Sequence, residues 1–163
     1  MPLIDQSDTI NKQVNSLEMS ENDKKIKILL VDDDELIRIY FRDVFWIHGL
    51  EYKYDLLLAD NIKKAEEIIN NEETRPQIIF LDLVMPIERD GKIITTPEAG
   101  LETLKKIKSD PKTKNIKVIV FSGHKDEKFQ EEAKRLGSET YLIKGDNLPK
   151  ELAEFVEKIA LEI

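Results

Sequence analysis

Five polar residues each stand at the end of a short apolar run: Asp32 and Asp33 together, then Asp82, Ser122 and Lys144. Clustered carboxylates repel one another unless a cation lies among them, and oxygen-only ligands suit Mg²⁺ or Mn²⁺, which keeps several waters and shares a phosphate oxygen. A carboxylate can also attack phosphorus, while a lysine and a hydroxyl neutralise the phosphoryl oxygens. The pattern therefore predicts a metal-dependent phosphate site with a carboxylate acceptor.

Each of these residues alone has an ordinary structural explanation. The aspartates could cap helices or form turns, Ser122 could be a turn hydroxyl, and Lys144 could be a solvated surface residue. Their occurrence together, after successive apolar runs, favours a shared site.

The elements that must position these residues alternate along the chain. Five apolar runs have the length and β-branched composition of buried strands, namely Ile26–Val31, Leu56–Ala59, Ile78–Leu81, Val118–Phe121 and Tyr141–Ile143. The intervening segments have helical period and helical end signals, at about 36–48, 62–71, 97–109 and 126–136, and from about 149 to the end. This alternation predicts an α/β fold, in which helices cover both faces of a parallel sheet. In such a sheet the functional crevice lies at the carboxyl ends of the strands, where the five polar residues stand.

Composition limits the classes of function. The 163 residues carry a formal net charge of -8, which argues against a nucleic-acid surface, and there is no cysteine for a disulfide or a thiolate metal site. The first 25 residues lack a basic region followed by an apolar one, and no apolar run reaches the roughly 18 residues that a membrane span needs. We therefore expect a cytoplasmic protein with no membrane or nucleic-acid partner.

Four motifs resemble the receiver domain of response regulators in two-component signalling, the CheY-like family. They occur in the family's order and spacing: Ile28-Leu-Leu-Val-Asp-Asp-Asp-Glu35, Ile79-Phe-Leu-Asp-Leu-Val-Met-Pro86, Val118-Ile-Val-Phe-Ser-Gly123 and Tyr141-Leu-Ile-Lys144. The resemblance covers residues 25–163. It implies a flavodoxin-like, doubly wound, five-stranded parallel sheet of order 2-1-3-4-5, with five helices on both faces.

The resemblance also implies roles for individual residues. Asp82 corresponds to the phosphoacceptor. Asp33 and Asp82 correspond to direct Mg²⁺ ligands, Asp32 acts largely through water, and Val84 offers its backbone carbonyl.

Further residues correspond to the family's switch. Ser122 is expected to hydrogen-bond the phosphoryl group, Lys144 to pair with a phosphoryl oxygen, and Tyr141 to be the aromatic rotamer switch. His124, two residues after Ser122, could tune hydrolysis of the acyl phosphate or simply be a solvated loop residue.

The resemblance implies a stand-alone regulator that is phosphorylated by a histidine kinase or a histidine phosphotransfer protein. Its phosphorylation would shift its conformation, and a separate downstream effector protein would read that shift. No turnover of a separate substrate is expected, because the chain would catalyse only its own phosphorylation and dephosphorylation.

Three segments depart from the family pattern. Residues 1–24 lie outside it and are expected to form a disordered or weakly helical extension. Residues 87–99 form an insertion beside Asp82, where the Asp90-Gly91 turn signal favours a small hairpin or flap. Gly145 replaces the proline that usually follows the lysine, so Lys144 could be less rigidly aimed.

Other functions compete with this interpretation. A pseudo-receiver would bind a partner whether or not it is phosphorylated. A haloacid-dehalogenase-type phosphohydrolase would use Asp32 as its nucleophile, but that leaves Asp82 without a role. A dinucleotide-binding enzyme is disfavoured because no Gly-x-Gly-x-x-Gly follows the first strand.

Overall fold

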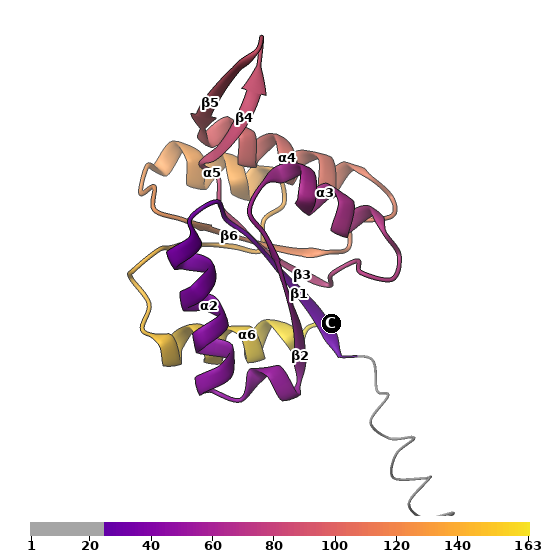
Figure 1. Ribbon diagram of the computed structural model, residues 1–163, viewed down its shortest axis with the longest axis vertical. Coiled ribbons are helices and arrows are strands. Elements are labelled where there is room, and N and C mark those ends of the chain that lie inside the picture. The colour runs from indigo at the N-terminus through magenta and orange to yellow at the C-terminus, as the bar shows by residue number, and fades with distance from the viewer. Residues whose placement is uncertain (1–24) are drawn as a thin grey trace, which may run out of the picture.

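The computed structural model describes residues 25–163 and contains two sheets. The main sheet has five parallel strands in the order β2-β1-β3-β6-β7 (Figure 1). Their bounds are β1 Ile26–Val31, β2 Tyr54–Ala59, β3 Ile78–Leu81, β6 Lys117–Ser122 and β7 Thr140–Ile143. This confirms the predicted fold class and strand order, although β2 begins two residues earlier than expected. The prediction for residues 1–24 lies outside the described residues.

The main sheet is apolar along its central strands because helices cover it on both sides. Alternate residues of β1 point to opposite faces: Leu29 and Val31 join one core cluster, and Ile28 and Leu30 join the other. Figure 1 shows α3, α4 and α5 on the first face and α2 and α6 on the second. Strands that are buried on both faces need apolar residues at every position, so they appear in the sequence as continuous hydrophobic runs.

The helices begin where the sequence offers caps. The described part of the chain has five α-helices, which are α2 Glu35–Ile47, α3 Ile62–Asn70, α4 Pro97–Ser109, α5 Glu127–Arg135 and α6 Pro149–Ala160. A short 3₁₀ helix, η2, spans Leu50–Tyr52. The side chains of Asp34, Asn61, Thr96 and Asp126 each accept a hydrogen bond from a backbone N–H in the first turn of the helix that follows. These caps fix the points at which the chain leaves each strand end and turns into a helix.

An antiparallel hairpin stands apart from the main sheet. Its strands are β4 Met85–Arg89 and β5 Lys92–Thr96, which lie outside the main sheet and flank the Asp90-Gly91 turn signal that favoured a small hairpin. Asp90 and Gly91 form the turn, both with positive φ (54° and 71°), as a type I′ turn requires. Figure 1 shows the hairpin projecting beyond α4. That the segment is a family insertion and acts as a flap stays a prediction.

Among the described residues, no helix is long and apolar enough to cross a membrane.

Candidate functional site

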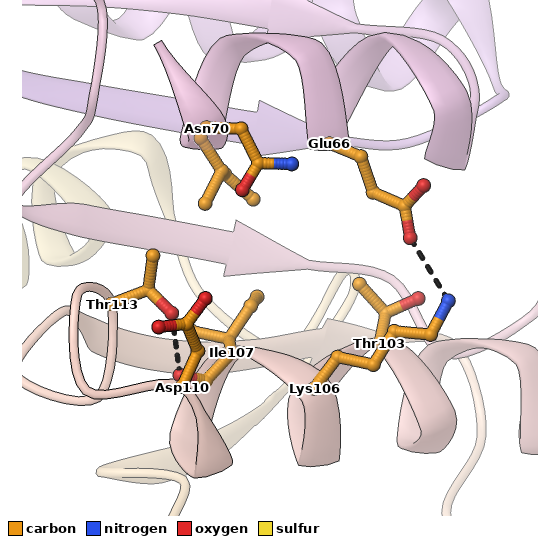
Figure 2. A pocket seen from close by; sticks show the side chains of 8 residues that line it. Glu66, Asn70, Thr103, Lys106, Ile107, Asp110 and Thr113 are labelled. Carbon is orange, nitrogen blue, oxygen red and sulfur yellow. Dashed lines mark hydrogen bonds and ion pairs between the residues drawn. The ribbon is translucent and has the colours of Figure 1, made fainter. Parts of the chain in front are cut away.

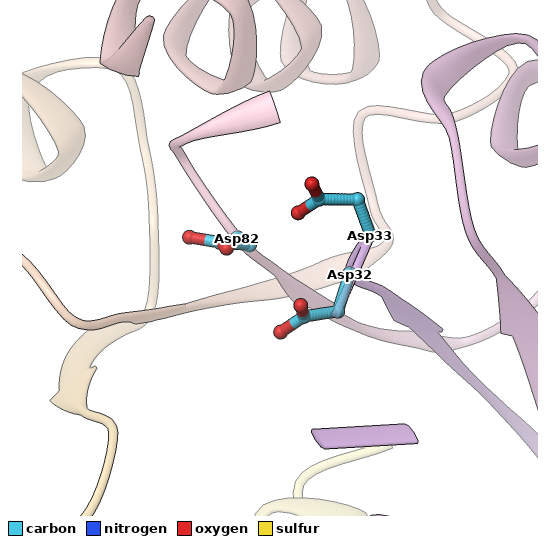
Figure 3. Close-up of side chains that lie close together, drawn as sticks. All are labelled: Asp32, Asp33 and Asp82. Carbon is cyan, nitrogen blue, oxygen red and sulfur yellow. The ribbon is translucent and has the colours of Figure 1, made fainter. Parts of the chain in front are cut away.

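Three carboxylates gather at the carboxyl ends of the two central strands. Asp32 and Asp33 follow β1 and Asp82 follows β3, and one oxygen from each lies within 4.8 Å of the others (Figure 3). Asp32 is fully buried and Asp82 is 4% exposed, whereas Asp33 is exposed. The structure therefore brings these three carboxylates together, and their role as one metal site stays a prediction.

The sheet itself positions the buried carboxylates. The backbone N–H of Asp32 donates to Ala59 O (3.0 Å), and that of Asp82 donates to Val31 O (2.9 Å), so hydrogen bonding between strands continues one residue past each strand. The N–H of Asp34 also donates to Asp32 Oδ1 (3.0 Å). Both side chains are thus held at the rim of the sheet.

Lys144 connects the two buried carboxylates. Its Nζ lies 2.6 Å from Asp82 Oδ2 and 2.6 Å from Asp32 Oδ2. The Lys144 backbone N–H donates to Ser122 O (2.9 Å), which extends the β6–β7 pairing by one residue. Burial alone would lower the pKa of Lys144, but the adjacent carboxylates outweigh burial and raise that pKa above its ordinary value. Lys144 is therefore a fixed cation in the site.

The Asp32 carboxyl has a perturbed pKa. Burial raises its pKa to about 6, against the lowering effect of Lys144 and together with repulsion from Asp82. Asp32 Oδ2 is paired with Lys144 Nζ and accepts no further hydrogen bond from the described residues. A buried carboxylate oxygen of this kind, beside two further carboxylates, retains a lone pair that can coordinate a hard divalent cation. The donor set fits Mg²⁺ or Mn²⁺.

The loop after β3 holds the other oxygen of Asp82. The backbone N–H of Val84 donates to Asp82 Oδ1 (3.2 Å). The N–H of Gly100, in the first turn of α4, donates to Leu83 O (3.0 Å). A Cβ on Gly100 would lie 2.3 Å from Leu83 Cα and 2.7 Å from Asp82 O. Only glycine allows the helix to approach the backbone beside Asp82 this closely.

Sequence reasoning missed two residues that shape the site. Gly100 lies inside the helix expected at about 97–109, and the local pattern does not reveal the chain segment that it approaches closely. Arg38 was not singled out at all, yet its Nη1 donates to the carbonyl oxygen of Asp32 (2.8 Å). Its position in the first turns of the helix that follows Asp32 and Asp33 was the available signal.

The predicted switch residues lie on the neighbouring strands. Ser122 is fully buried at the end of β6. Tyr141, on β7, donates its hydroxyl to His124 O (2.9 Å), and burial raises its pKa. The His124 imidazole is exposed and meets the Phe129 ring edge to face, with centroids 6.1 Å apart. Tyr141 is thus joined to His124 by a hydrogen bond to the backbone carbonyl.

Gly145 adopts a backbone conformation that proline cannot. Its φ is +85°, whereas a proline ring fixes φ near −65°. No atom lies within 4 Å of the position of an added Cβ, so the backbone angle is what requires glycine here. The loop after Lys144 therefore has a backbone conformation that a proline at position 145 could not adopt.

A separate hollow of about 210 Å³ lies between α3 and α4 (Figure 2). Four of its polar lining residues have partners: Lys106 pairs with Glu66 (3.0 Å), and the Thr103 and Thr113 hydroxyls donate to backbone carbonyls. It shares no lining residue with the carboxylate cluster.

Comparison with known proteins identifies the family. The sequence model of the response regulator receiver domain matches residues 28–157. The chain belongs to the response regulator receiver family. The receiver spans strands β1 to β7 and most of α6, so the carboxylate cluster lies inside the matched region.

Relatives of this receiver include proteins of different length. The uncharacterized transcriptional regulatory protein YxjL of Bacillus subtilis is 29% identical over 140 residues, which is 85% of this chain but only 56% of YxjL. Sporulation initiation phosphotransferase F of Bacillus subtilis is 32% identical over 118 residues, 72% of this chain and 81% of that protein. The Mn²⁺-bound form of response regulator Rcp1 is 27% identical, with a TM-score of 0.61 over 82% of this chain and 91% of that one.

Proposed function

We propose that this receiver accepts a phosphoryl group on Asp82 and thereby changes conformation. The observation that carries the proposal is the position of the Asp82 carboxylate. It lies at the end of the central strand β3, beside two other carboxylates and 2.6 Å from Lys144 Nζ. Family membership supports the same chemistry. The test is the intact mass of the wild type and of Asp82→Asn after incubation with Mg²⁺ and acetyl phosphate.

The metal would be held by Asp32, Asp33 and Asp82, with the backbone carbonyl of Val84 as a further ligand. Asp33 and Asp82 would coordinate directly and Asp32 largely through water. A divalent cation supplies neutralisation of the phosphoryl oxygens and fixes their orientation. The buried Asp32 Oδ2, whose one partner among the described residues is the Lys144 ammonium group, and the Mn²⁺ in the related Rcp1 support this assignment.

Asp82 acts as the nucleophile. One of its carboxylate oxygens forms a bond to phosphorus while the bond from phosphorus to the donor's histidine nitrogen breaks, and the electron pair of that bond leaves with the imidazole. Lys144 already contacts Asp82 Oδ2, so its ammonium group can move to a phosphoryl oxygen without crossing the site. The Val84 N–H holds Oδ1 and limits rotation of the carboxylate.

The response to phosphorylation would run through Ser122 and Tyr141. The Ser122 hydroxyl would move to hydrogen-bond the phosphoryl group, and Tyr141 would leave the carbonyl of His124 and turn inward. The phosphoryl group favours this state because it makes contacts there that it lacks in the other state. His124 could tune hydrolysis through its exposed imidazole.

The phosphodonor would be a histidine kinase or a histidine phosphotransfer protein, and a separate effector protein would read the switched state. The similarity to a phosphotransferase supports a protein donor. We propose a cytoplasmic location, with neither nucleic acid nor membrane as a partner, in keeping with the net charge of -8. The chain would catalyse only its own phosphorylation and dephosphorylation.

A phosphorylation-independent pseudo-receiver is the second candidate. The observation that favours it is the unusual loop at Gly145, whose φ of +85° directly follows the lysine of the site. Binding of the effector that is equal for wild type and Asp82→Asn, with or without phosphodonor, would support this candidate. The family match favours a receiver over a haloacid-dehalogenase-type phosphohydrolase.

A further inference from the structure

The outer edge of β5 is exposed and rich in β-branched residues. Lys92, Ile93, Ile94 and Thr95 are all exposed, and Ile93 is 79% exposed. The hairpin forms a sheet of only two strands, and Figure 1 shows its turn end projecting beyond α4, while Met85 and Ile87 at its base pack on the core. An exposed apolar strand with an unpaired edge is a template for another strand.

The register shows which backbone groups face outward. Arg89 and Lys92 flank the two-residue turn, so this pair exchanges hydrogen bonds within the hairpin. Because hydrogen-bonded and non-hydrogen-bonded pairs alternate, Ile93 and Thr95 direct their N–H and C=O groups away from β4. On the opposite edge the corresponding position in β4 is Pro86, which has no N–H. The β5 edge is therefore the one suited to pairing.

We propose that two copies of this chain associate through antiparallel pairing of β5 with β5. The twofold axis passes beside Ile94, so that the two Ile94 side chains meet. Ile93 of each copy then pairs with Thr95 of the other through the outward backbone groups. The result is a four-stranded antiparallel sheet of order β4-β5-β5-β4. This proposal does not depend on phosphorylation of Asp82.

Charge complementarity favours a second copy over an unrelated strand. In this register Lys92 lies opposite Thr96 of the other copy, on the same face of the sheet. The Thr96 hydroxyl donates to the Glu98 carboxylate, which holds that carboxylate beside the strand end. Neither Lys92 nor Glu98 forms an ion pair within residues 25–163. The symmetry therefore creates two Lys92–Glu98 pairs and opposes no like charges along the strand.

The pairing is expected to be weak. A five-residue edge covers much less than the roughly 1,600 Å² of a standard stable interface, so association belongs to the transient class. Sedimentation velocity of the full chain, from about 10 µM to about 1 mM, spans the range in which such a dimer forms. We expect the weight-average sedimentation coefficient to rise with concentration toward the dimer value.

A pair of proline variants tests whether association uses the β5 edge of the hairpin. Thr95→Pro removes an outward donor from β5, whereas Glu88→Pro removes an outward donor from the β4 edge, which Pro86 already interrupts. Thr95→Pro should stay monomeric over the whole range, and Glu88→Pro should associate like the wild type. Circular dichroism verifies that both variants are folded.

Charge reversal tests the register. Lys92→Glu and Glu98→Lys should each weaken association, and the double variant should restore it, because only direct contact between the two positions predicts rescue. A wild-type chain that stays monomeric at all concentrations overturns the proposal. Association that Thr95→Pro leaves unchanged also overturns it, since the dimer then uses another surface.

Discussion

Lys144 Nζ lies 2.6 Å from Asp82 Oδ2 and at the same distance from Asp32 Oδ2, so one lysine serves both buried carboxylates of the site. The lysine comes from the end of β7, at the edge of the sheet, and the carboxylates come from the two central strands β1 and β3. The site is thus assembled from three strands of the sheet, and the ion pairs of Lys144 connect the carboxylates that follow β1 and β3.

Replacing Lys144 should slow phosphorylation far more than it affects folding. Lys144→Met keeps the aliphatic stem but removes the cation that would neutralise a phosphoryl oxygen, a loss that typically costs about 100-fold in rate. The rate with acetyl phosphate and Mg²⁺ measures this effect. Lys125→Met is the matched control, because Lys125 is exposed in a nearby loop and pairs with Asp146. Equal rates for Lys144→Met and the wild type would rule out the role proposed for Lys144.

The raised pKa of Asp32 predicts a pH-dependent stability cost in the metal-free protein. The folded state holds this proton up to a pKa of about 6, whereas the unfolded chain releases it near the ordinary aspartate pKa of 3.8. Between these values the folded state binds more protons, so the free energy of unfolding falls as pH rises. Asp32→Asn should therefore be more stable than the wild type at pH 7, by on the order of 2–3 kcal/mol, with little difference near pH 4.

Urea unfolding in chelator, from pH 4 to pH 7, measures the Asp32 effect. Asp34→Asn is the control, because Asp34 caps α2 from an exposed position and asparagine caps equally well. A stability difference for Asp32→Asn that does not grow with pH would show that burial does not raise the pKa of the Asp32 carboxyl.

Gly100→Ala should destabilise the protein by about 2–4 kcal/mol, because its Cβ would overlap the backbone of Leu83 and force α4 away from the loop that follows Asp82. Thermal unfolding measures the loss. Gly123→Ala is the matched control, since no atom lies within 4 Å of its added Cβ. Comparable stabilities for the two variants would mean that α4 can shift freely.

Much of this arrangement follows from local patterns in the sequence. Buried parallel strands are apolar throughout, and their polar ends must lie at one edge, so Asp32, Asp33 and Asp82 could be placed together before their distances were known. The bridging position of Lys144 could not be derived, because it depends on how β7 packs beside β6. The roles of Gly100 and Arg38 could not be predicted for the same reason. Gly100 packs against the backbone of Leu83 and Arg38 donates to the carbonyl of Asp32, and only the folded chain brings these groups together.

Removing the hairpin tip, residues 88–93, tests whether the segment beside Asp82 restricts phosphodonors. If it acts as a flap, the deletion should raise the rate with acetyl phosphate several-fold and change the ratio of that rate to the rate with a histidine kinase. Both rates are measured at low protein concentration, where the chain is monomeric. Unchanged rates with both donors would show that the hairpin does not restrict access of phosphodonors to Asp82.

The central claim is that Asp82 accepts a phosphoryl group with the help of a divalent cation. Intact mass spectrometry of wild type, Asp82→Asn and Asp33→Asn, incubated with acetyl phosphate and either Mg²⁺ or chelator, tests it most directly. We predict a gain of one phosphoryl group in the wild type with Mg²⁺, little gain in chelator or in Asp33→Asn, and none in Asp82→Asn. An equal gain in Asp82→Asn, or no gain in the wild type with either acetyl phosphate or a phosphorylated histidine kinase, would contradict the account.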